Sequence, residues 1–383
     1  MIKIMKTPDD LRTWIEIDKA AIAHNYRVFR KLIGKKTKFL AVVKSNAYGH
    51  NLLEFAPEME RLGAGWLGVD SLMEAFAVRR LGVKLPVLVL GSTLPKLFPE
   101  ARIKRISITV SNFDQLKNVL VLPRGKEPLK LHIKVDTGMH RQGFQLHEAE
   151  RLLAMLKKNK PGQFLAEGLY THFAEAKDPR TSDSTKRQIS EFREWVKKFR
   201  DAGFNLIIHA AATGGAMLYP EAHFDMVRIG IGNYGLWPSS EAERHLGKKI
   251  TLRPVLSWKA VVSEVKQVKK GERVGYDLTE RLMRDSAIAV VPVGYWHGVP
   301  RLLSSKGRVL IKGKTARIVG RVSMDMIVVD ITDIPKVKAG DEATLIGRSG
   351  KEEIKAGEIA AFAGTTHYEI VTRLNPLIKK FYL

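Results

Sequence analysis

Short apolar runs rich in β-branched residues alternate with amphipathic stretches through the first two thirds of the chain. Residues 52–62 and 192–199 place their apolar side chains at helical spacing. Eight runs have the length and composition of buried strands, namely 39–43, 66–69, 87–90, 107–110, 131–135, 168–172, 206–209 and 226–229. Eight consecutive strand and helix pairs predict a (β/α)8 barrel of the TIM type. An open doubly wound sheet is the alternative, but it usually has a glycine-rich first turn, which is absent here.

The pattern changes after about residue 252, where strand-like runs are separated by Gly, Pro and Asp turns. These runs cover residues 261–265, 287–293, 309–311, 316–319, 327–331 and 343–346. Residues 236–249 contain Pro238, two serines and a charged stretch, which is typical of a connection. We therefore predict a barrel domain over residues 13–240 and a β-rich C-terminal domain over residues 250–383, joined by the N-terminal segment 1–12.

Composition narrows the setting of these two domains. A chain of 383 residues is long enough for two hydrophobic cores. No run approaches the roughly 18 apolar residues that a membrane-spanning helix needs, and the start of the chain lacks the apolar core of a signal peptide. The absence of cysteine excludes disulfides and thiolate metal sites. We therefore expect a cytoplasmic protein without a metal site, neither secreted nor inserted in a membrane.

The formal net charge of +24 would attract polyanions such as nucleic acids. Lysine and arginine are nevertheless scattered along the whole chain in short groups such as Lys157-Lys158 and Lys197-Lys198. There is neither a basic tail nor a basic stretch interleaved with aromatic residues. This distribution favours a solvated basic surface, so we do not expect a nucleic-acid partner.

Candidate chemistry follows the barrel strands, because barrel enzymes build their sites at the carboxyl ends of the strands. Lys44 follows the first run, where partial desolvation would expose a neutral amine able to form a Schiff base, although many strands simply end in lysine. The other polar residues at this rim are Arg141, His172, Thr213 and Arg228. Backbone N–H groups near Gly230 and Ile231, with the Thr213 hydroxyl, can hold a phosphate. The pattern indicates a phosphate-bearing cofactor opposite a Schiff-base lysine.

These segments resemble those of the alanine racemase family. Residues 41–49 resemble its cofactor-lysine signature, residues 134–141 its "KVDTGM.R" segment and residues 227–236 its "VRPGI..YGL" segment. Further matching segments are 171–174, 274–276, 320–325 and 368–369. The resemblance runs in the family's order from about Thr13 to Arg373. It implies an enzyme dependent on pyridoxal 5'-phosphate (PLP) that interconverts L-alanine and D-alanine and supplies D-alanine for peptidoglycan.

The resemblance implies two catalytic bases. Lys44 would bind the cofactor aldehyde and serve as one base, and Tyr276 of a neighbouring subunit would be the other. Racemisation needs this arrangement, because one group removes the Cα proton and another delivers a proton from the opposite side. Since a free phenol ionises only near about pH 10, nearby cations must favour the Tyr276 phenolate. The resemblance therefore also implies a homodimer, in which Tyr276 and Met324 complete the partner's site.

The resemblance assigns the remaining contacts as well. Arg228 would face the pyridine nitrogen and keep it unprotonated, which limits transamination. Arg141 would hydrogen-bond the cofactor's phenolic oxygen and, with Met324, contact the substrate carboxylate. The other implied contacts are His172 with the cofactor ring, Tyr295 at the entrance, and Tyr48, Thr213, Gly230, Ile231 and Tyr368 with the phosphate. In some members the lysine matching Lys134 is carbamylated and positions the arginine matching Arg141.

Three departures from the family pattern leave the substrate open. Ala212 stands where asparagine is frequent, Asp277 where glycine is common, and His297 in a segment that is usually acidic. Racemisation of serine or of a basic amino acid is therefore an alternative, although the positive net charge disfavours cationic substrates. A PLP decarboxylase of related architecture generally has glutamate opposite the ring nitrogen and a cysteine near the partner's site, whereas this chain has Arg228 and no cysteine. A non-catalytic basic binding protein is the alternative from another class.

Overall fold

The computed structural model describes residue 7 and residues 10–383. Most of the predicted joining segment 1–12, namely residues 1–6 and 8–9, lies outside the described residues. The chain divides into two compact units. One comprises residues 20–47 and 52–254, and the other comprises the chain up to Lys19, residues 48–51 and residues 255–383.

The first unit contains a closed barrel of eight parallel strands, as the sequence predicts. The strands are β2 (Lys38–Val42), β3 (Trp66–Val69), β4 (Val87–Val89), β5 (Ile106–Val110), β6 (Leu129–Lys134), β7 (Phe164–Tyr170), β8 (Ile207–Ala212) and β9 (Met226–Ile229). Every residue of β3, β4, β5 and β9 is buried, because a parallel barrel is covered on both faces. This explains why the strands read as uninterrupted apolar runs.

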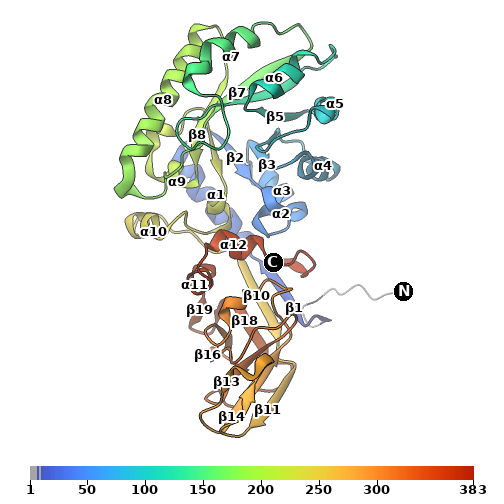
Figure 1. The fold of residues 1–383 in the computed structure, drawn as a ribbon, viewed down its shortest axis with the longest axis vertical. Helices are drawn as coiled ribbons and strands as arrows, with labels where there is room; N and C mark the ends of the chain where they lie inside the picture. Colours follow the sequence, from blue (N-terminus) through green and yellow to red (C-terminus); the bar gives the residue numbers. More distant parts are fainter. Residues whose placement is uncertain (1–6, 8–9) are drawn as a thin grey trace, which may run out of the picture. The chain divides into compact units, whose positions relative to one another are not determined.

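Helices cover the barrel strands. They are α1 (Lys19–Ile33), α2 (Lys44–Tyr48), α3 (Leu52–Arg61), α4 (Leu72–Arg80), α5 (Phe98–Ile103), α6 (Phe113–Leu120), α7 (Ala149–Leu156), α8 (Ser182–Asp201), α9 (Thr213–Leu218) and α10 (Ser240–Leu246). Figure 1 shows α4 to α8 on the outside of the strands. In α8, Phe192, Trp195, Val196 and Phe199 are buried on one face, at the spacing that the sequence showed. The predicted connection 236–249 contains α10, whose cap is Ser239, with its side chain accepting the Ala242 N–H.

The second unit is rich in antiparallel strands, which confirms the predicted β-rich domain. Its largest sheet has the order β16-β15-β18-β10-β1-β20, with β19 beside β18, and smaller sheets join β11-β14-β17 and β12-β13. The strands are β1 (Thr13–Ile17), β10 (Leu256–Val261), β11 (Glu264–Val268), β12 (Arg273–Val274), β13 (Glu280–Arg281), β14 (Ser286–Val291), β15 (Arg308–Ile311), β16 (Lys314–Arg317), β17 (Ile327–Asp330), β18 (Glu342–Ser349), β19 (Glu352–Ile354) and β20 (Lys380–Tyr382). Two helices, α11 (Ala356–Phe362) and α12 (His367–Thr372), belong to the same unit.

Two details differ from the sequence-based elements. The run 261–265 is not one strand, because Val262 N donates to Asp341 O while Ser263 N donates to Val290 O, so the chain changes sheets between them. Strand β1 pairs with β10 and β20, although residue 13 was assigned to the barrel. The domain limits 13–240 and 250–383 stay a prediction, from which the compact units differ at β1.

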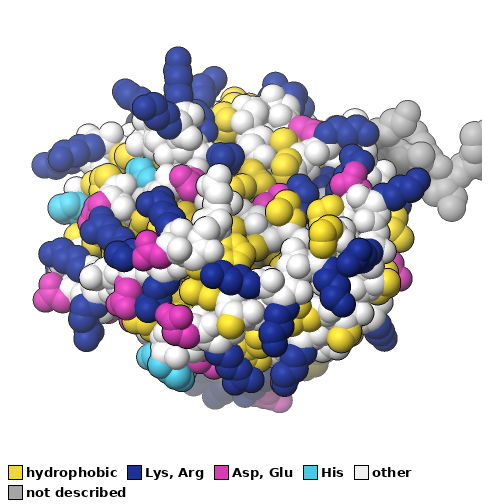
Figure 2. All heavy atoms as spheres, turned by 90° about the horizontal axis from the view of Figure 1, so that it is seen from above, with side chains coloured by type: hydrophobic (Ala, Val, Ile, Leu, Met, Phe, Trp, Pro, Cys, Tyr) yellow, Lys and Arg dark blue, Asp and Glu magenta, His cyan; other side chains and the backbone are white. Residues whose placement is uncertain are grey.

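The basic residues are spread over the surface. Figure 2 shows lysine and arginine side chains across the whole visible face, with acidic and apolar side chains between them. Several form ion pairs, such as Lys197 with Asp201 at 2.6 Å and Arg284 with Asp333 at 2.5 Å. No helix in the described part of the chain is both long and apolar enough to cross a membrane.

Candidate active site

Lys44 stands in an unusual backbone segment directly after β2. Ser45, Asn46 and Ala47 have left-handed angles with φ of 54°, 55° and 53°. This conformation costs roughly 1–2 kcal/mol for each residue that carries a Cβ, so neighbouring contacts must hold it. Ala47 N donates to Val43 O at 2.9 Å, and Asn46 Oδ1 accepts the Leu52 N–H at 2.8 Å. Strain of this kind is often found at functional sites, because it fixes the start of the segment in one geometry.

The Lys44 amine remains accessible. Its side chain is 37% exposed, and Nζ lies 3.2 Å from Asp70 Oδ1. Asp70 follows β3 and was not predicted as a site residue. An exposed ion pair contributes little stability, so the amine can leave Asp70 at small cost.

Arg228 on β9 is a cation inside the barrel, only 3% exposed. Its guanidinium donates to Thr171 O and Ala210 O, both at 2.7 Å. It also donates to the Nδ1 atoms of His209 at 2.9 Å and His172 at 3.1 Å. Burial lowers the pKa of Arg228 to about 10, which still leaves it charged at neutral pH. Thr171 O, Ala210 O and His172 Nδ1 all face Nη2, which carries only two hydrogens, whereas His209 Nδ1 faces Nη1. These contacts therefore use three of the five N–H groups and leave one donor on Nη1 and one on Nε for a bound molecule.

His172 lies beside this guanidinium in the neutral form. Burial, followed by the nearby charge of Arg228, lowers the pKa of His172 to about 3. The charges of Arg141, Lys134 and Lys44 act in the same direction, so these side chains lie near His172. Because arginine can only donate, Nδ1 of His172 must accept and its proton must sit on Nε2. The barrel residues predicted from the strand ends are thus brought together.

Asp136 builds the loop that carries Arg141. Its Oδ1 accepts the backbone N–H groups of Gly138, Met139 and His140, each at 3.0 Å. Three bonds to one carboxylate oxygen fix the turn after β6. Arg141 itself is exposed. The loop therefore presents an exposed, charged side chain on a backbone that is hydrogen-bonded to Asp136.

Lys134 at the end of β6 is buried, and its Nζ donates to Gln142 Oε1 at 3.1 Å. Burial, with the charges of Arg141 and Arg228, lowers the pKa of Lys134 to about 8. A substantial fraction of this amine is therefore neutral near physiological pH.

The predicted phosphate ligands fall into two groups. Thr213 is 4% exposed, and its Oγ1 accepts the N–H groups of Gly230 at 3.1 Å and Gly232 at 3.4 Å. With both lone pairs used, the Thr213 hydroxyl hydrogen remains as a donor. Ile231 follows Gly230 and begins a 3-10 turn ending at Tyr234. Ala212, directly before Thr213, supplies no side-chain cap to α9.

Tyr48 and Tyr368, the other predicted phosphate ligands, belong to the second unit. Their ring centroids lie 6.3 Å apart. Burial, with Tyr48 beside it, raises the pKa of Tyr368, so its hydroxyl stays protonated and can act as a donor. Gly49 is required here, because a Cβ on it would lie 1.9 Å from Val371 O, and its φ is +83°. The second unit thus brings this pair of tyrosines together.

The remaining predicted residues lie on the surface of the second unit. Tyr276 is 70% exposed, Met324 54% and Tyr295 46%. The segments of Tyr295 and Met324 adjoin, since Tyr295 N donates to Ser323 O and Trp296 N to Met324 O, both at 3.0 Å. The Tyr276 segment is joined to the segment before Met324 by the ion pair of Asp277 with Arg321. Large apolar side chains that share one exposed area often mark a partner-binding surface.

Two of the three departures from the family pattern have a structural explanation. Asp277, next to Tyr276, forms an ion pair with Arg321, with Oδ2 3.1 Å from Nε. Its charge is therefore partly neutralised. His297 is buried, its Nδ1 accepts the Gly294 N–H at 3.2 Å, and burial lowers its pKa. The histidine therefore supports the loop of Tyr295 as a neutral ring.

Sequence reasoning missed the polar residues inside the barrel. His132, Glu167 and His209 sit on β6, β7 and β8. His132 and His209 lie within the predicted runs 131–135 and 206–209, whereas Glu167 lies one residue before the run 168–172. Polar residues at inward positions of such strands are the signal that could have identified them, because buried polar groups must be hydrogen-bonded.

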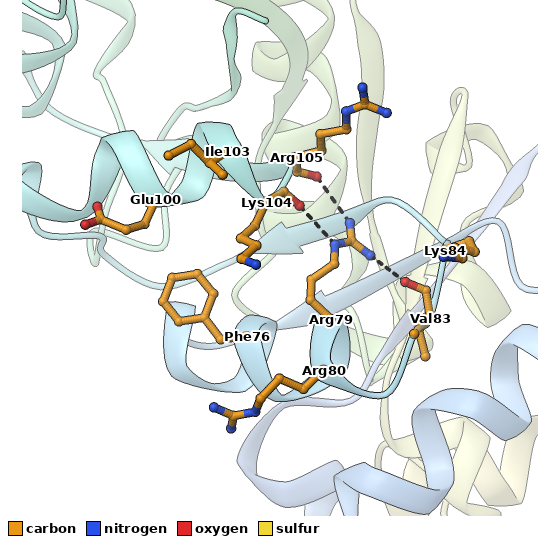
Figure 3. A pocket seen from close by; sticks show the side chains of 10 residues that line it. Phe76, Arg79, Arg80, Val83, Lys84, Glu100, Ile103, Lys104 and Arg105 are labelled. Carbon is orange, nitrogen blue, oxygen red and sulfur yellow. Dashed lines mark hydrogen bonds between the residues drawn. The ribbon is translucent and has the colours of Figure 1, made fainter.

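A groove between α4 and α5 is not part of this site. It has a volume of about 770 Å³ and is lined by Phe76, Arg79, Arg80, Gly82, Val83, Lys84, Glu100, Ile103, Lys104 and Arg105. Figure 3 shows Arg79 turned toward the backbone of its neighbours. Its guanidinium donates to four carbonyl oxygens, those of Val83, Leu85, Lys104 and Arg105, at 2.8–3.2 Å. Arg79 therefore supports the loops, and none of the predicted site residues lines the groove.

The neutral histidines predict acid sensitivity. Burial lowers the pKa of His132, His172 and His209 below the ordinary 6.5. Below that pH the unfolded chain binds protons at these positions and the folded chain does not, so the free energy of unfolding falls as pH falls. The slope of each such histidine approaches about 1.4 kcal/mol per pH unit where the unfolded residue is protonated and the folded ring is still neutral.

Urea unfolding at about pH 7.5 and pH 5.5 measures this slope. The variant His209→Asn should reduce it, whereas His245→Gln, at an exposed position, should leave it unchanged. Equal slopes in the wild type and His209→Asn would contradict the assignment of His209 as a buried neutral ring.

Comparison with known proteins agrees with this geometry. Residues 17–238 match the family model "Alanine racemase, N-terminal domain", and residues 255–382 match "Alanine racemase, C-terminal domain". The alanine racemase of Desulforamulus reducens is 37% identical, with 97% of this chain and 98% of that protein covered. The alanine racemase of Syntrophobacter fumaroxidans is 38% identical, with 94% of each covered.

Solved structures give the same result. The alanine racemase of Bacillus anthracis with bound L-Ala-P has a TM-score of 0.90 and 35% identity, covering 97% of this chain and 95% of that one. The alanine racemase of Bartonella henselae with covalently bound pyridoxal phosphate has a TM-score of 0.86 and 27% identity, covering 97% of this chain and all of that one. This chain belongs to the alanine racemase family of amino-acid isomerases.

Proposed function

We propose that this protein interconverts L-alanine and D-alanine with PLP as its cofactor, and that it supplies D-alanine for peptidoglycan in the cytoplasm. The observation that carries the proposal is the buried Arg228, which contacts four acceptors in the barrel through Nη1 and Nη2 and keeps N–H donors on Nη1 and Nε. A guanidinium is a permanent donor, so it suits an unprotonated ring nitrogen and a weak electron sink. The Bartonella henselae relative, which carries covalently bound pyridoxal phosphate, supports the cofactor.

The chemistry of the donor set fits PLP. Lys44 offers an accessible primary amine for the aldehyde, and the Thr213 hydroxyl offers a donor for the phosphate. The cations Lys44, Arg141 and Arg228 provide the positive charge that a dianionic phosphate and a substrate carboxylate require. When bound, the cofactor supplies an aromatic ring that withdraws electrons from the substrate Cα.

The chain's own residues then move the proton. Lys44 Nζ takes or returns the Cα proton on one face, and the Tyr276 oxygen acts on the other. Arg228 holds its donor toward the ring nitrogen, which favours return of the proton to Cα and limits transamination. Arg141 and Met324 place the substrate carboxylate, His172 contacts the ring, and Tyr295 narrows the entrance. Gly230, Ile231, Tyr48 and Tyr368 hold the phosphate with Thr213.

We further propose that the active form is a homodimer. Tyr276 and Met324 are among the more exposed large side chains of the second unit, so they are available to enter a neighbour's barrel mouth. When each subunit supplies these two side chains to the other, the dimer has two equivalent sites. Sedimentation of the active enzyme should give a dimer, and full activity in a monomer would contradict this proposal.

Carbamylation of Lys134 is a separate expectation. A buried amine whose pKa is lowered to about 8 reacts with carbon dioxide in its neutral form, and the resulting carbamate would carry a negative charge near Arg141. Protein loaded with 13C-bicarbonate should show one protected carbamate carbon by NMR. The signal should disappear in Lys134→Gln and persist in Lys130→Gln; its persistence in Lys134→Gln would contradict the assignment.

Racemisation of serine or of a basic amino acid, PLP-dependent decarboxylation, and a non-catalytic binding role are the alternatives. Circular dichroism of L-alanine, L-serine, L-lysine and L-arginine with the PLP-loaded enzyme separates them. We expect the alanine signal to decay fastest and to reach zero. If the dichroism signal of only one of the other amino acids decays, that amino acid is the substrate. Release of carbon dioxide would indicate a decarboxylase.

A further inference from the structure

Arg228 is a buried cation, and in the part of the chain that the structure describes it has no carboxylate within ion-pair distance. Its partners among the described residues are two carbonyl oxygens and two histidine rings, with the Tyr170 ring 5.2 Å from its Cζ. Buried charges are normally compensated by an opposite charge, because desolvation is costly. The anion that compensates Arg228 must therefore act through its neighbours.

A line of hydrogen-bonding groups leads from Arg228 to Glu167. His209 Nδ1 lies 2.9 Å from Arg228, and His209 Nε2 lies 2.8 Å from His132 Nδ1. His132 Nε2 then lies 3.4 Å from Glu167 Oε2. The two imidazole rings and the carboxylate lie on barrel strands, and both histidines are fully buried.

Glu167 is held as an anion at the far end of this line. Although burial raises the pKa of Glu167, its bonds with His132, Lys130 and Ser107 lower it to about 2. Lys130 Nζ lies 2.8 Å from Oε1, and Ser107 Oγ donates to Oε2 at 2.5 Å. The carboxylate therefore accepts from the serine hydroxyl, pairs with the lysine and faces His132 Nε2 at 3.4 Å.

The two ends fix the tautomers of both rings. Arg228 only donates, so His209 Nδ1 must accept and its proton sits on Nε2. That proton is donated to His132 Nδ1, which leaves the His132 proton on Nε2, facing the Glu167 carboxylate. Burial lowers the pKa of both histidines, so neither ring is charged at neutral pH. The direction of every bond in the line is thus determined.

Local backbone features are adapted to this line. Leu131 pairs with Ala166 and His132 with Gly168, so Glu167 is the extra residue of a β-bulge, a feature that re-aims a side chain. Gly168 leaves room for the His132 ring, because a Cβ there would lie 2.2 Å from His132 Nδ1. The rings of Tyr170 and His209 are stacked, with their centroids 4.7 Å apart, and this contact fixes the plane of the His209 ring.

We propose that Glu167 is a positioning residue for the reaction, and that it orients Arg228 through the tautomer-locked pair His132 and His209. The carboxylate polarises both rings, so that His209 presents a lone pair to the guanidinium and holds it in one orientation. The catalytic part of this inference rests on the proposed function, because only a bound cofactor gives Arg228 a ring nitrogen to face. The tautomer part depends on the barrel alone.

The first test uses the wild-type holoenzyme with 15N-labelled histidine. Long-range NMR correlations should show His132 and His209 as neutral Nε2–H tautomers, assigned with His132→Gln and His209→Gln. A proton on Nδ1 of His209 would overturn the proposal without any variant. If both histidines are Nε2–H tautomers but the protein does not racemise alanine, the proposed function is wrong, whereas the hydrogen-bonded connection from Glu167 to Arg228 still stands.

The second test compares Glu167→Leu with Glu167→Gln. Leucine leaves the buried Nε2–H of His132 without an acceptor, and this cost offsets the preference that Arg228 imposes through His209. Both tautomers of His132 should therefore appear, and pyruvate formed per racemisation event should rise about tenfold. Glutamine can still accept from His132 Nε2–H, so in Glu167→Gln the His132 tautomer and the pyruvate formed per racemisation event should be close to the wild-type values. The control Lys197→Gln removes an exposed lysine that pairs with Asp201 and should leave the ratio unchanged. If Glu167→Leu lowers racemisation and transamination equally, its role is only structural and the proposal is wrong.

Discussion

Lys44→Ala is expected to lose covalent cofactor attachment and at least a thousandfold in alanine racemisation. The variant removes both the amine that binds the aldehyde and one of the two bases, and a positioned base alone contributes roughly 100- to 10,000-fold. Folding should be unaffected, because the side chain is partly exposed and its ion pair with Asp70 is weak. The measurement is the visible absorbance of the lysine-linked cofactor, with circular dichroism of L-alanine on the same sample.

Lys197→Ala serves as the matched control. Lys197 is 75% exposed and pairs only with Asp201 among the contacts that the structure describes, so its removal should leave absorbance and activity unchanged. Borohydride reduction of the wild type followed by peptide mass spectrometry should place the cofactor on Lys44. Attachment at another lysine, or racemisation by Lys44→Ala above a tenth of the wild-type rate, would contradict the assignment.

Tyr276→Phe is expected to slow racemisation in both directions by about 100- to 10,000-fold, because inversion needs a base on each face. Hydrogen exchange at Cα should persist for one enantiomer only, since Lys44 still serves its own face. Folding should again be unaffected, because the side chain is 70% exposed. NMR of each enantiomer in D2O measures the exchange separately from inversion. Equal loss of exchange for both enantiomers would contradict a role confined to one face.

Subunit mixing shows which copy supplies Tyr276. In a dimer of one Lys44→Ala and one Tyr276→Phe subunit, exchange of Tyr276 between subunits leaves one site with both native bases. An equal random mixture of the two inactive variants should then recover about one quarter of the wild-type activity. No recovery would show that Tyr276 acts in its own subunit's site.

The barrel was predictable because each of its strands is a local signal. Runs such as 66–69 and 226–229 are buried on both faces and therefore apolar throughout, whatever the rest of the chain does. Strand β1 was not predictable in this way, since its partners β10 and β20 lie more than 200 residues away. Its alternating residues fit either unit until the pairing is known.

Some of the site residues were predictable from local signals and others were not. Lys44, Arg141, His172 and Arg228 follow strands whose carboxyl ends meet at one rim, so strand order alone places them together. The partners of these residues are harder to predict. Asp70 follows β3, the strand paired with β2, and contacts Lys44. Glu167 lies at a β-bulge, which changes the direction of its side chain. A single register shift changes which face a side chain occupies, and sequence alternation does not reveal it.

The most direct test of the proposed function is to follow L-alanine and D-alanine with the PLP-loaded wild type in D2O. NMR reports loss of the Cα hydrogen, and circular dichroism on the same samples reports inversion. We expect deuterium at Cα from both enantiomers and a dichroism signal that decays to zero from either side. Exchange without inversion, accumulation of pyruvate or an amine as the main product, or no change in either signal would contradict alanine racemisation by this protein.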